Sequence, residues 1–523
     1  MYPPLFEEMN EGSTMRPRLL ARSGYIPGIA AALIASVVML LLGRIWGAPV
    51  PTQLLADRIT SVTPVSIFGA ILGKLESSAK PLIFVLLLLG QLGVGALVGA
   101  LLGGLLKRGN SPLRLFIATS VVTFAVLGIV FAPLGNAGIF GQHSSAGMTT
   151  TALSFGIISL VFGGVLIVWL AAMESEIAIE YNESRRRVVN LVAVGVPVLL
   201  ASAYLGKFFV ALNKKSQVPT SPNTADGISP ALTPIDDFYV VSKNFIDPTV
   251  AQGSWSLSIE GLVEHPQTYT YDQIRSRPTS KHIATLECIS NEVGGEYISN
   301  GEWTGFPLKD LLGEAGVKSG VVDVVFYGDD GYSDSIPLSV ALDPNTFLVH
   351  ELDGQPLTKD HGFPVRMLVP NIYGMKNVKW LTKISLVNND FQGFWQHQGW
   401  SDVAVINTMS RIDFPHALDT VTLGRQIKVG GVAFAGSRGI KRVEVSTDGG
   451  NTWNDAQLQS PLSSLSWVIW SYEWTPSAAG KVTLEVRATD GTGQTQTKDE
   501  NPPLPDGSTG YHTVQVKVAQ ATT

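Results

Sequence analysis

The apolar positions of this chain gather in long unbroken runs up to about residue 213, and beyond that point they alternate with polar positions over short stretches. A hydrocarbon core of ~30 Å requires about 20 apolar residues in a helix, and the runs Tyr25–Trp46, Pro81–Leu106 and Val188–Phe209 meet this requirement. The stretch Leu115–Met173 contains no Asp, Glu, Lys or Arg and is too long for one span, so its break at Pro133–Thr150 divides it into two. The pattern therefore predicts five membrane-spanning helices.

The basic residues of this half lie in three segments: the N-terminal tail, the loop after the second span and the loop before the fifth (Arg16, Arg18, Arg22; Lys107, Arg108, Arg114; Arg185–Arg187). Loops that stay in the cytoplasm carry such an excess of Lys and Arg. Lys207, Lys214 and Lys215 run against the rule, but they adjoin a domain that must cross the membrane whatever its charge. We therefore expect a multi-pass protein of the cell membrane whose C-terminal half is extracytoplasmic.

The five spans show no chemistry of their own. Only one histidine, His143, precedes residue 230, so a haem held by two histidines of this half is excluded. The spans contain no acidic residue away from their ends, so no proton or ion path is visible. The shorter apolar piece Ile59–Gly73 contains Pro64, and we expect it to be an interfacial or re-entrant element. We interpret residues 1–212 as an anchor, or as a docking surface for another membrane protein.

The polar half begins with residues 213–234, whose Ser, Thr, Pro and Asn content predicts a flexible tether. Short β-runs and helical pieces alternate from there to about Val387, which is typical of an α+β domain, and we assign this domain to residues 235–400. Residues 401–523 contain regularly spaced short strands, which predict an immunoglobulin-like β-sandwich. The expected strands are Ile427–Phe434, Lys441–Ser446, Trp467–Trp474, Lys481–Thr489 and Thr513–Val518, with a hairpin turn at Asp448-Gly449-Gly450.

Charge and cysteine content exclude several functional classes. The net charge of the 523 residues is −6, and no basic stripe suggests a nucleic-acid partner. Because Cys288 is the only cysteine, an internal disulfide, a multi-cysteine zinc site, a cysteine-ligated iron–sulfur cluster and a CxxCH haem site are all excluded. The simplest interpretation of a lone cysteine is a small buried apolar side chain.

The local sequence around Cys288 favours a different interpretation. Cys288 ends an apolar, strand-like run and opens a glycine-rich loop, which is a place where a side chain is presented rather than packed. The neighbouring Glu287 and Glu292 would raise the pKa of a free thiol and disfavour a reactive nucleophile. A bound metal would deprotonate the thiol and remove that objection.

Five blocks of sequence, in order and at similar spacing, resemble the sulfite oxidase family over about Phe238 to Val518. They are Thr285–Asn291 around Cys288, Ile298–Leu308, His361–Pro370, Gly374–Leu381 and Val443–Trp453. Each block alone is weak, whereas the ordered set is specific. The resemblance implies a sulfite-oxidase-like fold for the α+β domain, an enzyme containing a molybdenum–molybdopterin cofactor, and a C-terminal domain of the kind that supports a homodimer.

The resemblance also implies roles for individual residues. Cys288 would be the thiolate ligand of molybdenum, and a soft thiolate suits a metal already bound by sulfur. His361 and Arg366 would contact the anionic tail of the pterin, and Asn377, Val378 and Lys379 would hold the same phosphate. Asp330 would hydrogen-bond to the pterin ring. Tyr239, Lys243 and Asn244 match the segment that wraps the cofactor.

The departures from the family pattern concern the substrate. Two arginines of the family's anion pocket have no counterpart, since one falls near Ser242–Lys243 and the other at Val293. A third matches Arg438. The position of a metal-proximal tyrosine is interpreted as His350, which is either a proton shuttle or a buried structural histidine. Because arginine is the usual clamp for oxyanions, we expect sulfite to be a poor substrate.

Three functional hypotheses remain. The first is two-electron, oxygen-atom-transfer chemistry on a small extracytoplasmic substrate, with an external or membrane-bound carrier exchanging the electrons. The second is a sulfoxide-type reductase fed by a membrane electron donor. The third is a catalytically degenerate domain that acts as a binding module.

The pair Arg185-Arg186 before the fifth span resembles a twin-arginine export signal, and an ordinary cytoplasmic basic cluster explains the same residues. A cofactor inserted in the cytoplasm requires export of a folded protein, which favours the first interpretation. Ala201-Ser202-Ala203 is compatible with a cleavage site, but the apolar run continues beyond it, so we expect a retained anchor.

Overall fold

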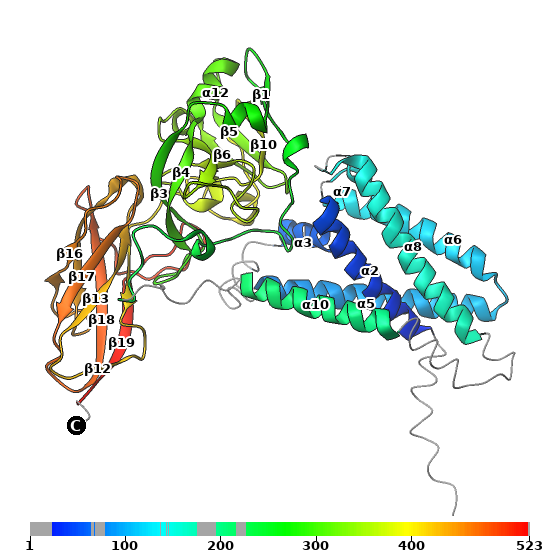
Figure 1. The fold of residues 1–523 in the computed structure, drawn as a ribbon, viewed down its shortest axis with the longest axis horizontal. Helices are drawn as coiled ribbons and strands as arrows, with labels where there is room; N and C mark the ends of the chain where they lie inside the picture. The colour runs from blue at the N-terminus through cyan, green and yellow to red at the C-terminus, as the bar shows by residue number, and fades with distance from the viewer. Residues whose placement is uncertain are drawn as a thin grey trace, which may run out of the picture. The chain divides into compact units, whose positions relative to one another are not determined.

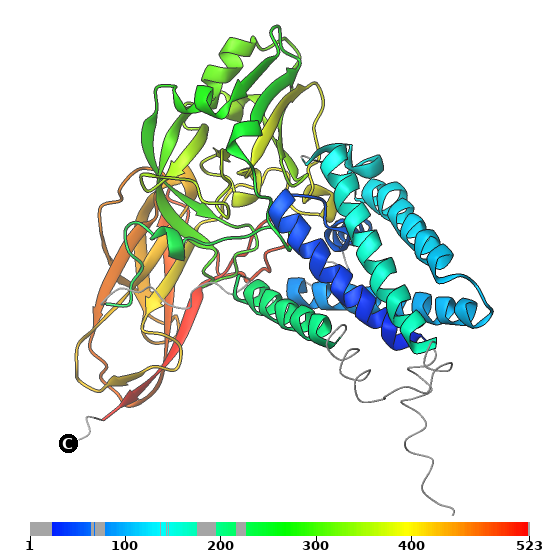
Figure 2. The same cartoon turned by 45° about the vertical axis from the view of Figure 1, so that its right-hand side comes forward.

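The computed structural model describes residues 24–63, 67, 79–135, 137–142, 144, 146–174, 195–215 and 226–520, which fall into two compact units (Figures 1 and 2). The helical unit comprises Met1–Val62, Ser77–Lys214 and Asn244–Thr249. The β-rich unit comprises Thr63–Glu76, Lys215–Lys243 and Val250–Thr523. Each unit is described by itself below.

The helical unit consists of helices that are mostly apolar. They are α2 (Tyr25–Trp46), α3 (Pro51–Val62), α5 (Ala79–Lys107), α6 (Pro112–Ala125), which continues through a π-helical turn (Val126–Phe131) into α7 (Ala132–Leu134), α8 (Gly147–Glu174) and α10 (Val196–Lys215). Four stretches are long and apolar enough to cross a membrane: Tyr25–Trp46, Leu82–Lys107, Pro112–Leu134 and Gly147–Met173. Four of the five predicted spans are therefore matched by helices of the required length.

The fifth predicted span is matched only in part. The apolar portion of α10, Val196–Val210, is shorter than a full span, and the first residues of the predicted span, 188–194, lie outside the described residues, as do Arg185 and Arg186. The count of five spans is thus not established. The sequence analysis also missed α3, because Gln53, Asp57 and Arg58 interrupt its apolar positions. The predicted interfacial element overlaps only the end of α3, and most of its remainder lies outside the described residues.

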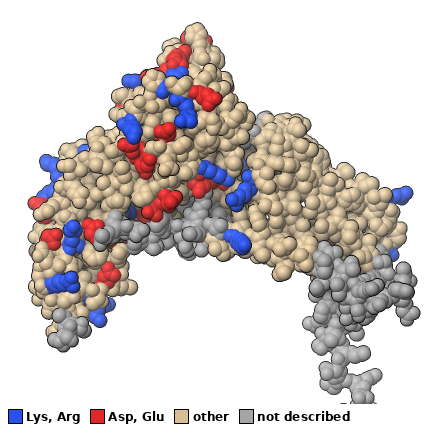
Figure 3. All heavy atoms as spheres, in the orientation of Figure 1, with Lys and Arg blue, Asp and Glu red and all other residues tan. Residues whose placement is uncertain are grey.

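Surface composition separates the two units. On the face drawn in Figure 3, the helical unit carries almost no charged atoms, whereas the β-rich unit carries both signs. Large apolar side chains on the helices are exposed, with Leu97 at 66% and Val168 at 69% of their accessible area. Because soluble proteins rarely expose so many contiguous apolar side chains, this surface is compatible with a lipid environment.

Helices α2 and α5 pack closely through glycines. Gly24 and Gly28 of one segment face Gly99 and Gly95 of the other, four residues apart in each case. A Cβ atom at Gly95 would lie 2.6 Å from the carbonyl oxygen of Gly28, so no larger residue fits without separating the backbones. Small residues at this spacing allow such close approach of helices in lipid.

The first part of the β-rich unit contains two sheets flanked by the short helices α11 (Tyr271–Arg275), α12 (Leu308–Ala315) and α13 (Leu338–Ala341). One sheet has the order β2 (Gln267–Thr270), β1 (Ser256–Gly261), β10 (Leu381–Val387), β5 (Asp323–Gly328), β6 (Ser333–Pro337). The other has the order β3 (Ser280–Glu287), β4 (Ile298–Pro307), β7 (Phe347–Leu352), β8 (Gln355–Pro356), with β9 (Arg366–Leu368) paired to β7. Buried side chains from both sheets and from α12 form a common core, in agreement with the α+β prediction.

The second part of the β-rich unit consists of two antiparallel-rich sheets that share a core. One contains β11 (Met409–Phe414), β13 (Ile427–Phe434), β17 (Val468–Trp474) and β16 (Gln457–Leu458). The other contains β12 (Thr420–Thr422), β19 (His512–Ala519), β18 (Gly480–Asp490), β14 (Ile440–Ser446) and β15 (Asn454–Asp455). Val429 and Trp470 of the first sheet pack with Val445, Leu484 and Val516 of the second. We call this part the β-sandwich, and its five predicted strands are confirmed to within two residues.

The segment that precedes the first strand is bound to the β-rich unit. Thr233 and Asn300 exchange two hydrogen bonds, in which the Thr233 N–H donates at 2.8 Å and the Asn300 N–H donates to Thr233 Oγ1 at 3.1 Å. The Ser229 N–H donates to Asp413 at 2.9 Å, and Ile228 is buried in the core. Residues 226–234 are therefore part of the folded unit and do not form the free tether expected from their composition.

The glycine contact between α2 and α5 yields a stability prediction. Gly95→Leu should destabilise the helical unit by at least the 1–3 kcal/mol typical of overpacking, because the new side chain meets backbone atoms of α2. Gly93→Leu is the matched control, since nothing lies within 4 Å of a Cβ there. Thermal unfolding of the detergent-solubilised chain should show a lower midpoint for Gly95→Leu alone. Equal midpoints for the two variants would contradict the proposed packing.

Candidate active site around Cys288

Cys288 follows β3 directly and is held by its backbone. Its N–H donates to Tyr297 O and its carbonyl accepts from the Asn291 N–H, both at 2.9 Å. The side chain is buried, and its Sγ lies 3.1 Å from Ser290 Oγ. Burial raises the pKa of the thiol, and hydrogen bonding by Ser290 lowers it. The charge of Glu287 raises the same pKa, and the charge of Lys379 lowers it. The geometry presents one thiol that needs a bound cation to ionise at neutral pH.

Arg366 at the start of β9 is a buried cation without a carboxylate partner in the described part of the chain. Its guanidinium donates to the carbonyl oxygens of His361 and Asn377, each at 3.2 Å, and to Met367 O at 3.4 Å. It also lies over the ring of Trp303, 5.2 Å from the centroid. Burial lowers its pKa to about 10, so it remains charged at neutral pH. A buried charge of this kind is costly unless an opposite charge accompanies it.

Lys379 adds positive charge to the same region, and His361 adds an imidazole that is neutral at neutral pH. His361 Nε2 lies 3.3 Å from Ile235 O, and burial together with the charges of Arg366 and Lys379 lowers its pKa to about 4. Lys379 Nζ donates to Val241 O at 3.1 Å and to Asp360 O at 3.0 Å. Lys379 influences the pKa values of both His361 and Cys288. Lys379 therefore acts electrostatically both on the histidine beside Arg366 and on the thiol.

Asn377, Val378 and Asp330 are fixed by backbone contacts. The Val369 N–H donates to Asn377 Oδ1 at 2.6 Å, and Asn377 Nδ2 donates to Tyr373 O at 3.3 Å. Val378 O accepts from the Met367 N–H at 2.9 Å. Asp330 Oδ1 accepts from the Tyr332 N–H at 3.0 Å. The chain that carries Asn377, Val378 and Lys379 thus runs beside Arg366.

The three residues predicted to wrap the cofactor lie in different settings. The Tyr239 N–H donates to Ser299 Oγ at 3.0 Å, and burial followed by the Cys288 charge raises the pKa of its phenol. Lys243 Nζ lies 5.4 Å from the ring centroid of Phe394. Asn244 is buried and groups with the helical unit.

Arg438 is engaged in the β-sandwich. Its Nε donates to Asp490 at 2.9 Å, and another nitrogen donates to Ile406 O at 2.8 Å and to Thr408 at 3.3 Å. Its charge nevertheless lowers the pKa of Tyr373, which the Cys288 charge raises. Arg438 is therefore near the site but largely neutralised by Asp490.

His350 and Val293 are not among the residues that are hydrogen-bonded to Arg366. His350 is buried beside a β-bulge of β7, and neither ring nitrogen has a hydrogen-bond partner within the described chain. Burial lowers its pKa, and the contributing charges are those of Glu351 and Arg275. Val293 is half-buried on the loop after Cys288, where it would lie 3.5 Å from a Cβ at Gly510.

The charge of Cys288 raises the pKa of two tyrosines that the sequence analysis did not select. Tyr332 donates from its hydroxyl toward Asp334 Oδ2 and Met375 O, both at 2.9 Å. Tyr373 accepts from the Asn407 N–H at 3.1 Å through its hydroxyl oxygen. Burial is the first cause that raises the pKa of each, and Cys288 adds to it. Nothing in the local sequence marks either tyrosine, because the contacts come from distant segments.

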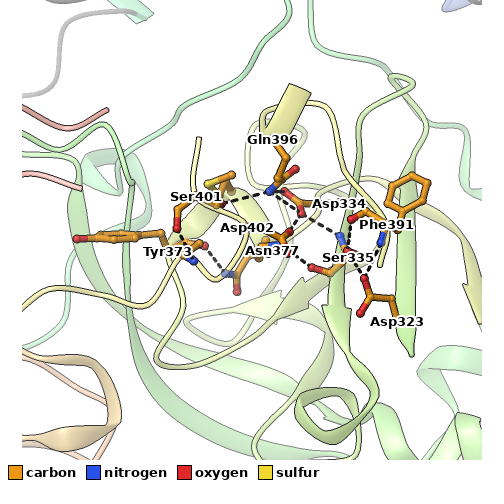
Figure 4. Close-up of polar contacts among 12 residues, drawn as sticks. Asp323, Asp334, Ser335, Tyr373, Asn377, Phe391, Gln396, Ser401 and Asp402 are labelled. Atoms are coloured by element: carbon orange, nitrogen blue, oxygen red, sulfur yellow. Dashed lines mark hydrogen bonds and ion pairs between the residues drawn. The ribbon is translucent and has the colours of Figure 1, made fainter. Parts of the chain in front are cut away.

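A buried ion network fixes the segment in front of Asn377 (Figure 4). Lys376 Nζ contacts Asp334 at 3.1 Å and Asp402 at 3.0 Å, and it donates to Ser335 O at 2.9 Å. Gln396 Nε2 donates to Asp334 at 3.1 Å. Lys376 is the last residue of the short helical turn Gly374–Lys376, so the network holds the chain directly before Asn377, Val378 and Lys379.

Comparison with known proteins bears on this site directly. Residues 244–395 match the oxidoreductase molybdopterin binding domain, and residues 401–518 match the Mo-co oxidoreductase dimerisation domain. Sulfite oxidase of Arabidopsis thaliana is 30% identical over 299 residues, which cover 48% of this chain and 76% of that protein. The chain belongs to the sulfite oxidase family.

Other members are similar over less of their length. Mitochondrial sulfite oxidase of Rattus norvegicus is 31% identical over 265 residues, 42% of this chain and 48% of that protein. NADH nitrate reductase of Solanum lycopersicum is 28% identical over 328 residues, 51% of this chain and 36% of that protein. The chain thus spans about half or less of these relatives. The sulfane dehydrogenase SoxCD of Paracoccus pantotrophus superimposes with a TM-score of 0.49 at 23% identity, over 56% of this chain and 82% of that one.

As a sulfite oxidase family member, the chain is a molybdopterin-dependent oxidoreductase with a molybdenum–molybdopterin cofactor. The residues present fit that group. Arg366 and Lys379 offer positive charge, His361 offers a neutral imidazole, and no carboxylate among the described residues is bound to Arg366, as an anionic tail requires. Cys288 offers one soft ligand to a metal that sulfur already holds. The hypothesis of a non-enzymatic binding module is therefore wrong.

The Lys376 network leads to a second stability prediction. Lys376→Met should lower the free energy of unfolding of the β-rich unit by about 3–5 kcal/mol, because it leaves Asp334 buried without its cation. Lys383→Met is the matched control, since its pair with Glu260 is exposed and such pairs contribute about 0–1 kcal/mol. Urea unfolding followed by tryptophan fluorescence measures both. Similar losses in the two variants would show that the buried network does not fix this segment.

Proposed function

We propose that this family member is a membrane-anchored oxidoreductase that transfers an oxygen atom to or from a small, weakly charged sulfur or nitrogen compound on the extracytoplasmic side. The observation that carries the proposal is that the β-rich unit contains both a buried thiol, Cys288, and a buried cation, Arg366, while Lys379 acts electrostatically on Cys288 and on His361. The cofactor requires two features of the protein: a thiolate that binds the metal and a cluster that binds the anionic tail of the pterin.

The chain's own residues would divide the work as follows. Cys288 would bind the metal as its protein ligand, and the bound molybdenum would supply two-electron oxygen-atom-transfer chemistry. Arg366, His361 and Lys379 would hold the anionic tail of the pterin. The buried Tyr332 and Tyr373 would exclude water from the thiol's surroundings and offer hydroxyl groups there.

The charges near Cys288 support a substrate other than sulfite. Val293 replaces an arginine, and Arg438 already pairs with Asp490 at 2.9 Å. Lys243 lies against the ring of Phe394. A dianion would therefore find less uncompensated positive charge than an arginine-lined pocket provides. The same feature favours the second candidate function, reduction of an uncharged sulfoxide with electrons from a membrane donor.

The proposed location rests on the helices and on the distribution of Lys and Arg. Four apolar helices of sufficient length support a multi-pass anchor, and the basic loops favour a cytoplasmic N-terminus with the catalytic part outside. We further propose a fifth span that includes α10, export in the folded state through Arg185 and Arg186, and an immunoglobulin-like class for the β-sandwich. The match of residues 401–518 to a dimerisation domain supports a homodimer.

Steady-state kinetics test the substrate. Sulfite oxidation with an artificial acceptor should have a low kcat/KM, because each lost charged contact to the anion costs about 1.5–3 kcal/mol, roughly ten- to a hundredfold. A sulfoxide panel with a reduced donor dye should give the higher value. Efficient sulfite oxidation by the unmodified chain would contradict the proposal.

Val293→Arg tests the same assignment by restoring a cation. It should raise sulfite turnover by about tenfold if the side chain reaches the pocket. Val322→Arg is the control, because Val322 is also solvent-accessible, at 45%, but lies outside the loop after Cys288. No gain from Val293→Arg in a folded protein would mean that this loop points away from the metal.

A further inference from the structure

The loop after Cys288 is held by the β-sandwich. Residues 288–297 join β3 to β4 and include Gly294 and Gly295, whose missing side chains leave the backbone free to adopt many conformations. Backbone hydrogen bonds and the Asn291 side chain hold the loop from within, and the β-sandwich adds contacts from outside it. We propose that the β-sandwich is a positioning element of the site, which fixes the orientation and burial of the Cys288 thiol through Arg411, Ser508 and His512.

Arg411 of β11 ties the loop to two other segments. Its three guanidinium nitrogens donate to Asp413 at 2.6 Å, to Gly295 O at 2.8 Å and to Ser229 Oγ at 2.9 Å. Asp413 in turn accepts from the Ser229 N–H at 2.9 Å. Both Arg411 and Asp413 are buried. Because every nitrogen is used and the ion pair is shielded from water, displacement of Gly295 would leave a buried charged donor without its partner.

Ser508 acts closer to the thiol. Its hydroxyl donates to Asn291 O at 2.7 Å, while the Asn291 N–H donates to Cys288 O at 2.9 Å. The Asn291 side chain accepts from the Tyr297 N–H at 2.9 Å and donates to Glu287 at 3.0 Å, so it fastens both ends of the loop. One hydrogen bond from the β-sandwich thus reaches the residue that is bonded to the cysteine backbone.

His512 of β19 makes the third contact with the loop. Its Nδ1 accepts from the Ile412 N–H at 2.9 Å, which fixes the ring, and the ring lies against Gly294. A Cβ at Gly294 would overlap that ring, and the φ of +76° there also favours glycine. Val293 lies beside Gly510 in the same contact. The β-sandwich therefore contacts the loop at Asn291 and from Val293 to Gly295.

The consequence rests on the proposed role of Cys288 as a metal ligand. A ligand side chain must be held to within a fraction of an ångström, and misplacement by about 1 Å can cost about a hundredfold in rate. The β-sandwich contacts act on Cys288 only through the loop, so they position the ligand without touching the reacting atoms. The proposal also expects the same contacts to keep the thiol buried in protein made without the cofactor.

Thiol labelling tests the proposal without the metal. Cys288 is the only cysteine, so alkylation of the full chain from a host unable to make the molybdenum cofactor reports on this thiol alone. Arg411→Met should raise the labelling rate about tenfold or more, since labelling follows the opening of the loop. Ser508→Ala, which removes one hydroxyl and no charge, should raise it severalfold.

Arg487→Met is the matched control. Arg487 makes a two-bond ion pair with Glu444, both bonds at 3.0 Å, in the same β-sandwich but without contact to the loop. Its labelling rate should stay within about twofold of the unmodified chain. In the holoenzyme, the electron paramagnetic resonance spectrum of molybdenum should change for Arg411→Met and not for Arg487→Met.

Unchanged labelling in folded Arg411→Met and Ser508→Ala would overturn the positioning role, as would an unchanged molybdenum spectrum in Arg411→Met. A purely structural role for Arg411 predicts a lower thermal midpoint with both readouts unchanged. Absence of molybdenum from the unmodified chain would overturn the proposed function instead. The two failures are thus distinguishable, because labelling requires no metal.

Discussion

The charge of Arg366 is the constraint on which the site depends. The guanidinium is buried, it is bonded to three carbonyl oxygens, and no carboxylate in the described part of the chain balances it. Burying a cation is unfavourable unless an anion accompanies it. The turn that begins at His361 and the segment that ends at Lys379 are shaped around this charge, since both supply carbonyls or further cations to it. A fold built in this way is suited to an anionic ligand and is incomplete without one.

Two supports outside the cation cluster keep the site in place. On one side, the buried contacts of Lys376 with Asp334 and Asp402 fix the segment that leads to Asn377 and Lys379. On the other side, the β-sandwich holds the loop that follows Cys288. The proposed metal ligand and the cations proposed to bind the tail thus belong to separate segments, and each segment is anchored by long-range contacts. This arrangement explains why the two domains of the β-rich unit form one compact body.

The sequence predicted the features that depend on local pattern. The span Tyr25–Trp46 and the strand Ile427–Phe434 follow from unbroken apolar runs and from alternation, and the structure has them with the same bounds. Cys288, His361 and Arg366 were selected because they lie in blocks that resemble a family. Helix α3 was missed, and the tether predicted over residues 213–234 does not hold for 226–234, because polar residues at these positions form contacts that periodicity does not reveal.

The sequence pattern could not predict which residues far apart along the chain contact one another. The pair of Arg438 with Asp490 joins residues 52 positions apart, and it turns a proposed anion clamp into a neutralised cation. Cys288 acts on the pKa values of Tyr332 and Tyr373 although both tyrosines are more than 40 positions away along the chain. The roles of all the predicted site residues, from Cys288 and Arg366 to His350 and Tyr239, stay predictions. In each case the chemistry depends on which side chains meet, and that is set by the fold rather than by spacing along the chain.

The central claim is that Cys288 and Arg366 hold opposite ends of one molybdenum cofactor. Metal and pterin analysis of the purified chain, of Cys288→Ser and of Arg366→Met tests it most directly, with Arg275→Met as the control for an exposed arginine. The account predicts the same molybdenum content in the unmodified chain and in Arg275→Met. It predicts pterin without turnover in Cys288→Ser, and loss of pterin in Arg366→Met. Full pterin content in Arg366→Met, or no molybdenum in the unmodified chain, would contradict it.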